Sequence, residues 1–167
     1  AAKTKAVSGL TQGIAGLFKA NKVDYFEGFG SFQDANTVQV QLNKGGEQVL
    51  NAKNVMLAVG ARARALPQIG LEADGDKIWA YRDALAPKKL PKTFVVIGSG
   101  AIGIEFASFY RALGSEVTVV EAIDRIMPVE DEEVSKAAQK GFEKRGIKFK
   151  TGAKVTKVSK TPKGVSV

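Results

Sequence analysis

A glycine-rich turn between an apolar strand and a helix constrains the fold of this chain more than any other feature. The turn is Gly98-Ser99-Gly100-Ala101-Ile102-Gly103, and the four residues before it, Phe94-Val95-Val96-Ile97, form an apolar run that predicts a buried strand. A helix over 101–113 and a second strand over 116–121 follow. A G-x-G-x-x-G pattern has little weight alone, but in this strand–turn–helix–strand context it predicts a Rossmann-type βαβ unit that binds a dinucleotide.

Each glycine of the turn has a separate expected role. Gly98 permits the tight turn, Gly100 lets the backbone approach a pyrophosphate, and Gly103 lets the helix pack close to the strand. The N–H groups of the first helical turn would then point at the phosphates with the positive end of the helix dipole. On the helix itself, helical spacing places four apolar residues on one face: Ile102, Phe106, Phe109 and Leu113.

An acidic residue stands where the second strand ends. Glu121 follows Gly103 by 18 residues, and a carboxylate at that place accepts hydrogen bonds from the adenine ribose. The same charge would repel a 2′-phosphate, so the sequence favours NAD over NADP, although Arg125 lies nearby and could soften that preference. The alternative is a surface glutamate beside a glycine turn that serves only packing.

Two further residues of the turn have open interpretations. Glu105, in the first turn beyond the glycines, is either part of the nucleotide loop or a solvated helix residue. Ser99 either donates to a phosphate oxygen or fills a position that needs a small side chain.

The rest of the chain predicts elements on both sides of this unit. Before it we expect a helix over 6–18 ending at Asn21 and Lys22, a strand over 23–27 broken by Gly28-Phe29-Gly30, and an antiparallel meander of 37–42 and 48–50 turning at Lys44-Gly45-Gly46. A short strand over 54–60, covered on both faces, and a connector over 61–92 with a short helix at 81–85 complete that part. After it we expect a helix over 131–145 ended by Gly146, strands at 147–150 and 155–158, and a turn at 161–164. We expect the domain boundary near Lys88 to Lys92.

Composition excludes several kinds of site. The 167 residues include no cysteine and no histidine, so this chain itself supplies neither a disulfide, nor a thiolate, nor an imidazole base. No apolar run approaches the roughly 18 residues that cross a bilayer. The net charge is +8, and the lysines and arginines are concentrated toward the C-terminus, but no aromatic residues alternate with them. A solvated surface is therefore favoured over a nucleic-acid interface, and neither a metal nor a membrane partner is expected.

The motifs resemble a known family. The segment VVIGSGAIGIEFASFYRALGSEVTVVE, preceded by LPKTF and followed by Asp124-Arg125-Ile126-Met127-Pro128, resembles the NAD domain of the dihydrolipoamide dehydrogenase family, FAD-dependent pyridine nucleotide–disulfide oxidoreductases that act as homodimers. The opening VSGLTQGIAGLFKANKVDYFEGFGSF resembles the segment after that family's redox disulfide, and the Ala58–Gly60 stretch resembles its A-T-G strand end. The likeness extends over essentially the whole chain.

The resemblance implies an α/β fold and roles for particular residues. The fold is a Rossmann-like three-layer FAD/NAD(P)-binding domain, in which 1–90 is the C-terminal part of an FAD domain with its helix, meander and connector, and 91–167 is a truncated NAD domain. Residues implied to contact NAD are Gly98, Ser99, Gly100, Ala101, Ile102, Gly103, Ile104, Glu105, Glu121 and Val155; those implied to contact FAD are Gly30, Val59, Gly60 and Ala61. Val59 departs from the family's threonine, so no side-chain role is carried over to it.

The resemblance also implies what the chain does within a larger protein. Electrons would pass from protein-bound dihydrolipoamide through a disulfide and FAD to NAD⁺, with lipoyl domains of a 2-oxoacid dehydrogenase or glycine cleavage complex as partners, in the cytoplasm or the mitochondrial matrix. The family's first FAD glycine motif, its C-x-x-x-x-C pair and its His–Glu pair have no counterpart in this sequence. We therefore expect an excerpt without turnover of its own. A glutathione- or mercuric-reductase-like protein and a noncatalytic nucleotide-binding module are the alternatives.

Overall fold

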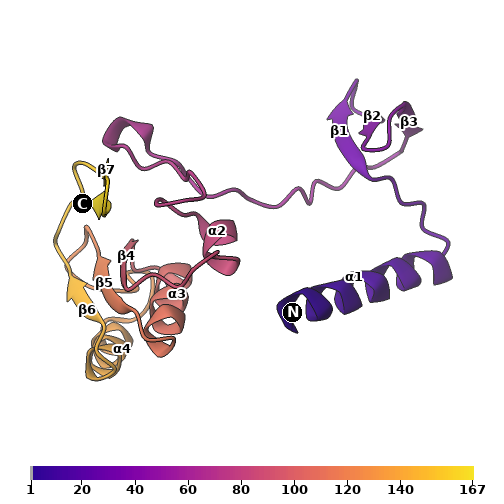
Figure 1. Cartoon of the computed structure of the whole chain (residues 1–167). Coiled ribbons are helices and arrows are strands. Elements are labelled where there is room, and N and C mark those ends of the chain that lie inside the picture. Colours follow the sequence, from indigo (N-terminus) through magenta and orange to yellow (C-terminus); the bar gives the residue numbers. More distant parts are fainter. Residues whose placement is uncertain (1) are drawn as a thin grey trace. The chain divides into compact units, whose positions relative to one another are not determined.

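The computed structural model describes residues 2–167, which divide into two compact units, residues 2–60 and Ala61–Val167 (Figure 1). The mixed α/β class expected from the sequence is confirmed. Among the helices of residues 2–167, we find none with both the length and the apolar character needed to cross a bilayer.

The first unit holds one helix and an antiparallel meander. Its elements are α1 (Ala2–Ala20), β1 (Gly28–Phe32), β2 (Thr37–Leu42) and β3 (Glu47–Asn51), with the strands paired in the order β1-β2-β3. Gly45 and Gly46 adopt φ of +90° and +85°, a conformation that favours glycine, and they confirm the predicted turn between β2 and β3.

The strand expected at 23–27 is wrong, because the pairing begins after it. Gly28 lies opposite Leu42, and a β-carbon at Gly28 would collide with the backbone oxygen of Gln41. The glycines of the 28–32 segment thus allow β1 to approach β2, where the sequence suggested that they end a strand.

The buried strand expected at 54–60 is also wrong. These residues are extended but unpaired among the described residues, and the side chains of Met56 and Val59 are 90% and 87% exposed. An apolar run becomes a strand only where a neighbouring strand accepts its hydrogen bonds, and the last such bond before the run joins Ala52 N–H to Asn36 O.

The second unit contains a parallel sheet with two connecting helices. Its main elements are β4 (Thr93–Ile97), α3 (Ala101–Ala112), β5 (Glu116–Val120), α4 (Glu132–Lys144) and β6 (Lys148–Lys150), with the strands in the order β4-β5-β6. Both crossovers advance in one direction along the sheet, and Tyr110 of α3 and Phe142 of α4 pack in the same core, so both helices cover the same face. The βαβ unit predicted around the glycine turn is confirmed.

The core of this unit lies between that sheet face and the helices. Val96, Val117 and Val119 point into it from the strands, and the fully buried Tyr110 enters it from α3. The Tyr110 hydroxyl donates to Ala84 O at 2.7 Å, which ties α3 to α2 (Tyr81–Leu85), the short helix predicted in the connector. The connector therefore packs on the βαβ core, and the domain boundary near residues 88–92 stays a prediction.

The apolar face expected on α3 is not its buried face, although Phe106 packs against the core. Ile102, Phe109 and Leu113 are 64%, 52% and 51% exposed, whereas the buried residues of the helix are Ile104, Ala107 and Tyr110. The close contact of Gly103 with the turn sets the helix rotation, so the side that carries Gly103, Ala107 and Tyr110 faces the sheet.

The chain ends in a hairpin of β7 (Ser159–Thr161) and β8 (Gly164–Ser166), which confirms the turn at 161–164. The strand expected at 155–158 is wrong, because the buried Val158 donates its N–H to Ile69 O at 2.6 Å, in the 3₁₀ turn η1 (Pro67–Ile69). A β-carbon on Gly70 would collide with Val158 O, so the connector and the hairpin approach closely here.

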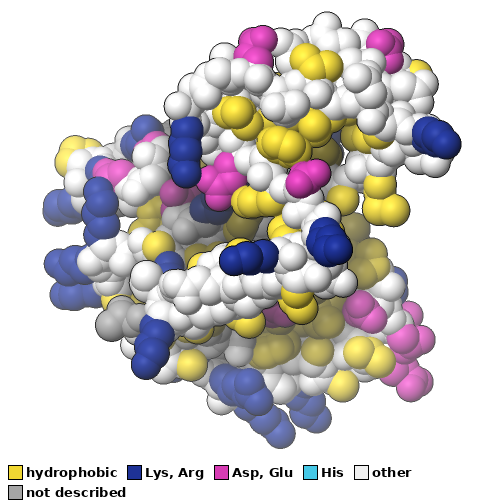
Figure 2. Space-filling view, turned by 90° about the vertical axis from the view of Figure 1, so that its right-hand side faces the viewer, with side chains coloured by type: hydrophobic (Ala, Val, Ile, Leu, Met, Phe, Trp, Pro, Cys, Tyr) yellow, Lys and Arg dark blue, Asp and Glu magenta, His cyan; other side chains and the backbone are white. Residues whose placement is uncertain are grey.

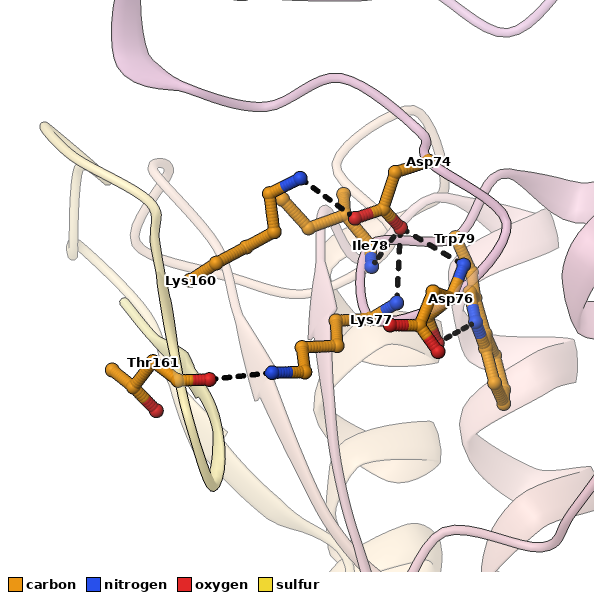
Figure 3. A network of polar contacts seen from close by, with 7 residues as sticks. All are labelled: Asp74, Asp76, Lys77, Ile78, Trp79, Lys160 and Thr161. Carbon is orange, nitrogen blue, oxygen red and sulfur yellow. Dashed lines mark hydrogen bonds and ion pairs between the residues drawn. The ribbon is translucent and has the colours of Figure 1, made fainter.

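A polar network holds the connector to this hairpin (Figure 3). Asp74 Oδ1 accepts the N–H groups of Asp76, Lys77 and Ile78, while Oδ2 lies 3.0 Å from Lys160 Nζ. Lys77 Nζ donates to Thr161 O at 2.5 Å. The three N–H donors, with Lys160, hold the pKa of Asp74 far below its ordinary value.

Candidate functional site

The glycine turn joins the carboxyl end of β4 to the start of α3. Gly98 adopts φ of +95°, and its N–H donates to Val120 O at 2.9 Å, which holds the turn against the end of β5. A β-carbon on Gly103 would collide with Gly98 O, whereas one on Gly100 would meet no atom within 4 Å. The close-packing role predicted for Gly103 is thus seen directly, and Gly100 faces open space.

The first N–H groups of α3 are available to a ligand. Gly100 is exposed, and Ile104 N–H is the first to find a helical acceptor, Gly100 O at 3.0 Å. No described residue accepts a hydrogen bond from the N–H of Gly100, Ala101 or Ile102. Such donors at a helix start, next to the open space at Gly100, fit an anionic group.

Glu121 follows β5 and turns its carboxylate toward the same turn. Oε2 accepts hydrogen bonds from Ser99 N–H at 2.8 Å and Ser99 Oγ at 2.6 Å, and Oε1 accepts Ile123 N–H at 3.0 Å. Burial, with the side chain only 9% exposed, acts to raise the carboxyl pKa. The hydrogen bonds from Ser99 and Ile123 outweigh that effect and hold the pKa below its ordinary value, so the group is a carboxylate at neutral pH.

A second layer of polar groups lies behind Ser99. Met127, which adopts φ of +47°, donates its N–H toward Ser99 O at 3.1 Å and Ser99 Oγ at 3.3 Å. The buried Ser135 of α4 donates its hydroxyl to Met127 O at 3.2 Å. Sequence reasoning missed Met127 and Ser135, because nothing in their local pattern marks them as neighbours of the turn.

Arg125 lies near the site but is already engaged. Its guanidinium donates to Pro128 O at 3.0 Å, within the loop between β5 and α4. The structure thus gives Arg125 a partner in its own loop, beside a cleft that also includes Asp124 and Lys136.

Four of the other residues predicted to bind NAD lie on the first turns of α3, and Val155 lies after β6. Ala101, Ile102 and Glu105 are exposed on the first turns of α3, and Ile104 is buried beneath them. Val155 is half-buried and follows Ala153, whose N–H donates to Glu121 O at 2.9 Å.

The residues predicted to contact FAD are dispersed along the chain. Gly30 lies in β1 opposite Val40, and Val59 and Gly60 end the first unit in an exposed extended segment where Gly60 adopts φ of +71°. Ala61 begins the second unit. Their role in cofactor binding stays a prediction.

Neither a metal centre nor a basic band stands out in the part of the chain that the structure describes. Within residues 2–167, no three acidic side chains come together in a way that could hold a metal ion. Figure 2 shows Lys and Arg side chains scattered over the visible face, with Asp and Glu among them.

Parallel strands joined through a glycine turn, with a carboxylate at the end of the second strand, define the class: a Rossmann-type dinucleotide-binding unit. The pyridine nucleotide-disulphide oxidoreductase model matches residues 1–167, and the chain belongs to that family. Its sequence is similar to dihydrolipoamide dehydrogenase of Chaetomium thermophilum, with 50% identity over 99% of this chain and 33% of that protein.

Other relatives and solved structures agree with that assignment. Dihydrolipoyl dehydrogenase of Rhizobium etli is 47% identical over 95% of this chain and 36% of its own length. The mitochondrial dihydrolipoyl dehydrogenase of Dictyostelium discoideum is 46% identical over 97% of this chain and 33% of its own length. LpdA of Mycobacterium tuberculosis superposes with a TM-score of 0.70 and 31% identity, covering 85% of this chain and 30% of that one. A ferredoxin reductase of Rhodopseudomonas palustris superposes with a TM-score of 0.71 and 28% identity, covering 89% of this chain and 38% of that one. The chain thus spans about a third of the length of these relatives.

Proposed function

We propose that this chain is the NAD-binding and partly FAD-contacting portion of a dihydrolipoyl dehydrogenase. The observation that carries the proposal is the pairing of the open, side-chain-free surface at Gly100 with the buried carboxylate of Glu121. The names of the relatives at 46–50% identity support the choice of enzyme.

The residues of the turn fit a dinucleotide. The N–H groups of Gly100, Ala101 and Ile102 would bind the pyrophosphate, because they have no acceptor among the described residues and a helix dipole behind them. Glu121 would accept hydrogen bonds from the adenine ribose, with Glu105 and the backbone of Val155 at the edge of the site. A fixed negative charge there favours a ribose that bears hydroxyls over one that bears a 2′-phosphate.

The FAD contacts and the partners belong to the same proposal. Gly30, Val59, Gly60 and Ala61 would lie along the flavin dinucleotide through their backbones, and the boundary of the NAD domain would fall near residues 88–92. When bound, FAD relays electrons and NAD⁺ accepts a hydride; the described residues of this chain hold and orient the nucleotide. The whole protein would be a homodimer that serves lipoyl domains of a 2-oxoacid dehydrogenase or glycine cleavage complex.

We place this protein in the cytoplasm of a bacterium or in the mitochondrial matrix of a eukaryote. Relatives of both kinds support this, including the bacterial enzyme of Rhizobium etli and the mitochondrial enzymes of Dictyostelium discoideum and Pisum sativum.

Calorimetric titration of the chain with NADH and NADPH tests the proposal. We expect NADH to bind at least about tenfold more tightly, since a buried carboxylate beside a 2′-phosphate costs at least about 1.4 kcal/mol. Glu121→Gln should bring the two affinities within a few-fold of each other. Glu116→Gln, at the opposite end of β5, is the matched control and should leave their ratio unchanged. Equal affinities in the unsubstituted chain would contradict the proposal and favour an NADP-type disulfide reductase. Binding of neither nucleotide would contradict both the proposed dihydrolipoyl dehydrogenase and the NADP-type reductase.

A further inference from the structure

The side chain of Ser99 does not face the space at Gly100 where a phosphate would lie. It is fully buried, and its Oγ lies 2.6 Å from Oε2 of Glu121, the closer of the two contacts that this oxygen receives from Ser99. The hydroxyl therefore acts on the carboxylate that we assign to the ribose.

The direction of this hydrogen bond is set by the carboxylate, which carries no proton at neutral pH and can only accept. A serine hydroxyl has a single proton, and Ser99 Oγ receives the N–H of Met127 at 3.3 Å. That proton goes to Glu121, and a lone pair of the same oxygen accepts the Met127 N–H. Ser135 of α4 donates its hydroxyl to Met127 O at 3.2 Å, and this bond restrains the loop that supplies the N–H.

The consequence for Glu121 is a carboxylate fixed in one rotamer. Oε2 is held by two donors from Ser99, which use both of its lone pairs, and Oε1 is held by Ile123 N–H, which leaves one lone pair on Oε1 for a further donor. A ribose hydroxyl can donate to that lone pair. A 2′-phosphate cannot, and a carboxylate held in this way has little freedom to turn away from it.

We propose that Ser99 is a positioning residue for nucleotide specificity, whose hydroxyl fixes the Glu121 carboxylate for a ribose hydroxyl and against a 2′-phosphate. This inference rests on the proposed NAD site. It assigns to the side chain of Ser99 a role that the glycine pattern leaves open, since that pattern fixes no residue type at this position.

Ser99→Ala is the direct test, because it removes the hydroxyl and keeps the backbone N–H. The matched control is Ser115→Ala. Ser115 is also fully buried, its Oγ donates to Pro91 O at 2.6 Å, and it lies at the opposite end of β5 from Glu121. Thermal unfolding of both variants shows whether each has folded and how much stability the loss of a buried hydroxyl removes.

The first readout needs no nucleotide. In ¹³C NMR titrations of the full chain, Ser99→Ala should raise the carboxyl pKa of Glu121, because one of its donors is gone, and Ser115→Ala should leave it unchanged. An unchanged pKa in Ser99→Ala would overturn the inference and leave the proposed function standing.

The second readout is the ratio of NADH to NADPH affinity. Loss of one hydrogen bond to a charged group predicts that Ser99→Ala lowers this ratio about tenfold, chiefly through weaker NADH binding, with no change in Ser115→Ala. An unchanged ratio, despite a raised pKa, would overturn the specificity role alone. A chain that binds neither nucleotide before any substitution would overturn the inference together with the proposed function.

Discussion

Gly103 of α3 packs directly against the carbonyl oxygen of Gly98 at the end of β4, in a space that a β-carbon would fill. The contact fixes how α3 meets the sheet and therefore which residues of that helix are buried. It also holds the turn whose N–H groups face the proposed nucleotide.

Two alanine substitutions separate packing from binding in this turn. Gly103→Ala should destabilise the chain by about 1–3 kcal/mol, because the backbone of Gly98 must move. Gly100→Ala should change stability by less than about 1 kcal/mol, since Gly100 has φ of −63° and an open β-carbon position. It should nevertheless weaken NADH binding more than about tenfold, because the methyl group occupies the space proposed for the pyrophosphate. Urea unfolding and NADH titration measure both effects, and tight NADH binding by folded Gly100→Ala would contradict this part of the account.

Glu121 should contribute a pH-dependent share of stability. Its pKa is lower in the folded chain than in the unfolded one, so the stabilisation is complete above the unfolded value of about 4.3 and is lost as pH falls through the folded value. At pH 7 we expect Glu121→Gln to be less stable by about 1–3 kcal/mol. Near pH 3 the difference in unfolding free energy between the two proteins should be smaller.

Urea unfolding of both proteins at several pH values measures that gap. Ser115→Ala, which removes a hydroxyl that does not titrate in this range, should show a constant difference. A gap for Glu121→Gln that stays constant or widens toward acid pH would show that the carboxylate is not stabilised by its hydrogen bonds.

Asp74 should matter more to stability than its ion-pair partner. Asp74→Ala removes the acceptor of three N–H groups and should cost about 2–3 kcal/mol, whereas Lys160→Ala removes one exposed ion pair and should cost less than about 1 kcal/mol (Figure 3). Thermal unfolding compares the two variants. Equal losses would mean that the ion pair, not the backbone turn, holds the connector to the hairpin.

The Tyr110 hydroxyl should stabilise the contact of α3 with α2. Tyr110→Phe leaves Ala84 O without its donor in a buried place and should cost about 1–2 kcal/mol. Tyr25→Phe, at a ring that is 63% exposed, provides the comparison and should change stability by less than about 0.5 kcal/mol. Calorimetric melting gives both values, and a neutral Tyr110→Phe would show that the bond is formed without net gain.

Local sequence patterns predicted the elements that rest on local chemistry. Asp131 begins α4 by accepting Glu133 N–H at 2.8 Å, Gly146 follows that helix with φ of +86°, and the helix at 81–85 agrees with α2 at both ends. In each case a cap, a glycine or a short periodic run carries the information within a few residues.

The failures concern features that depend on distant partners. The run at 54–60 and the residues before Val158 look like strands, but a strand forms only beside a neighbouring strand. Val158 instead donates its N–H to Ile69 in the 3₁₀ turn η1. For α3, the apolar residues alone suggested the wrong face. The spacing of Gly103, Ala107 and Tyr110 was available as a signal, because a glycine that must pack closely marks the buried side of its helix.

Some residues of the candidate site could likewise be identified from local sequence, and others could not. The glycines and Glu121 could be identified from their spacing, whereas the link from Ser135 through Met127 to Ser99 could not, because it joins the turn to a loop and a helix that lie well beyond it in the sequence.

A crystal structure of the chain with NADH tests the central claim most directly. We predict the pyrophosphate within hydrogen-bonding distance of the N–H groups of Gly100, Ala101 and Ile102, and an adenine ribose hydroxyl on the carboxylate of Glu121. A dinucleotide bound elsewhere, with no ligand at this turn, would contradict it.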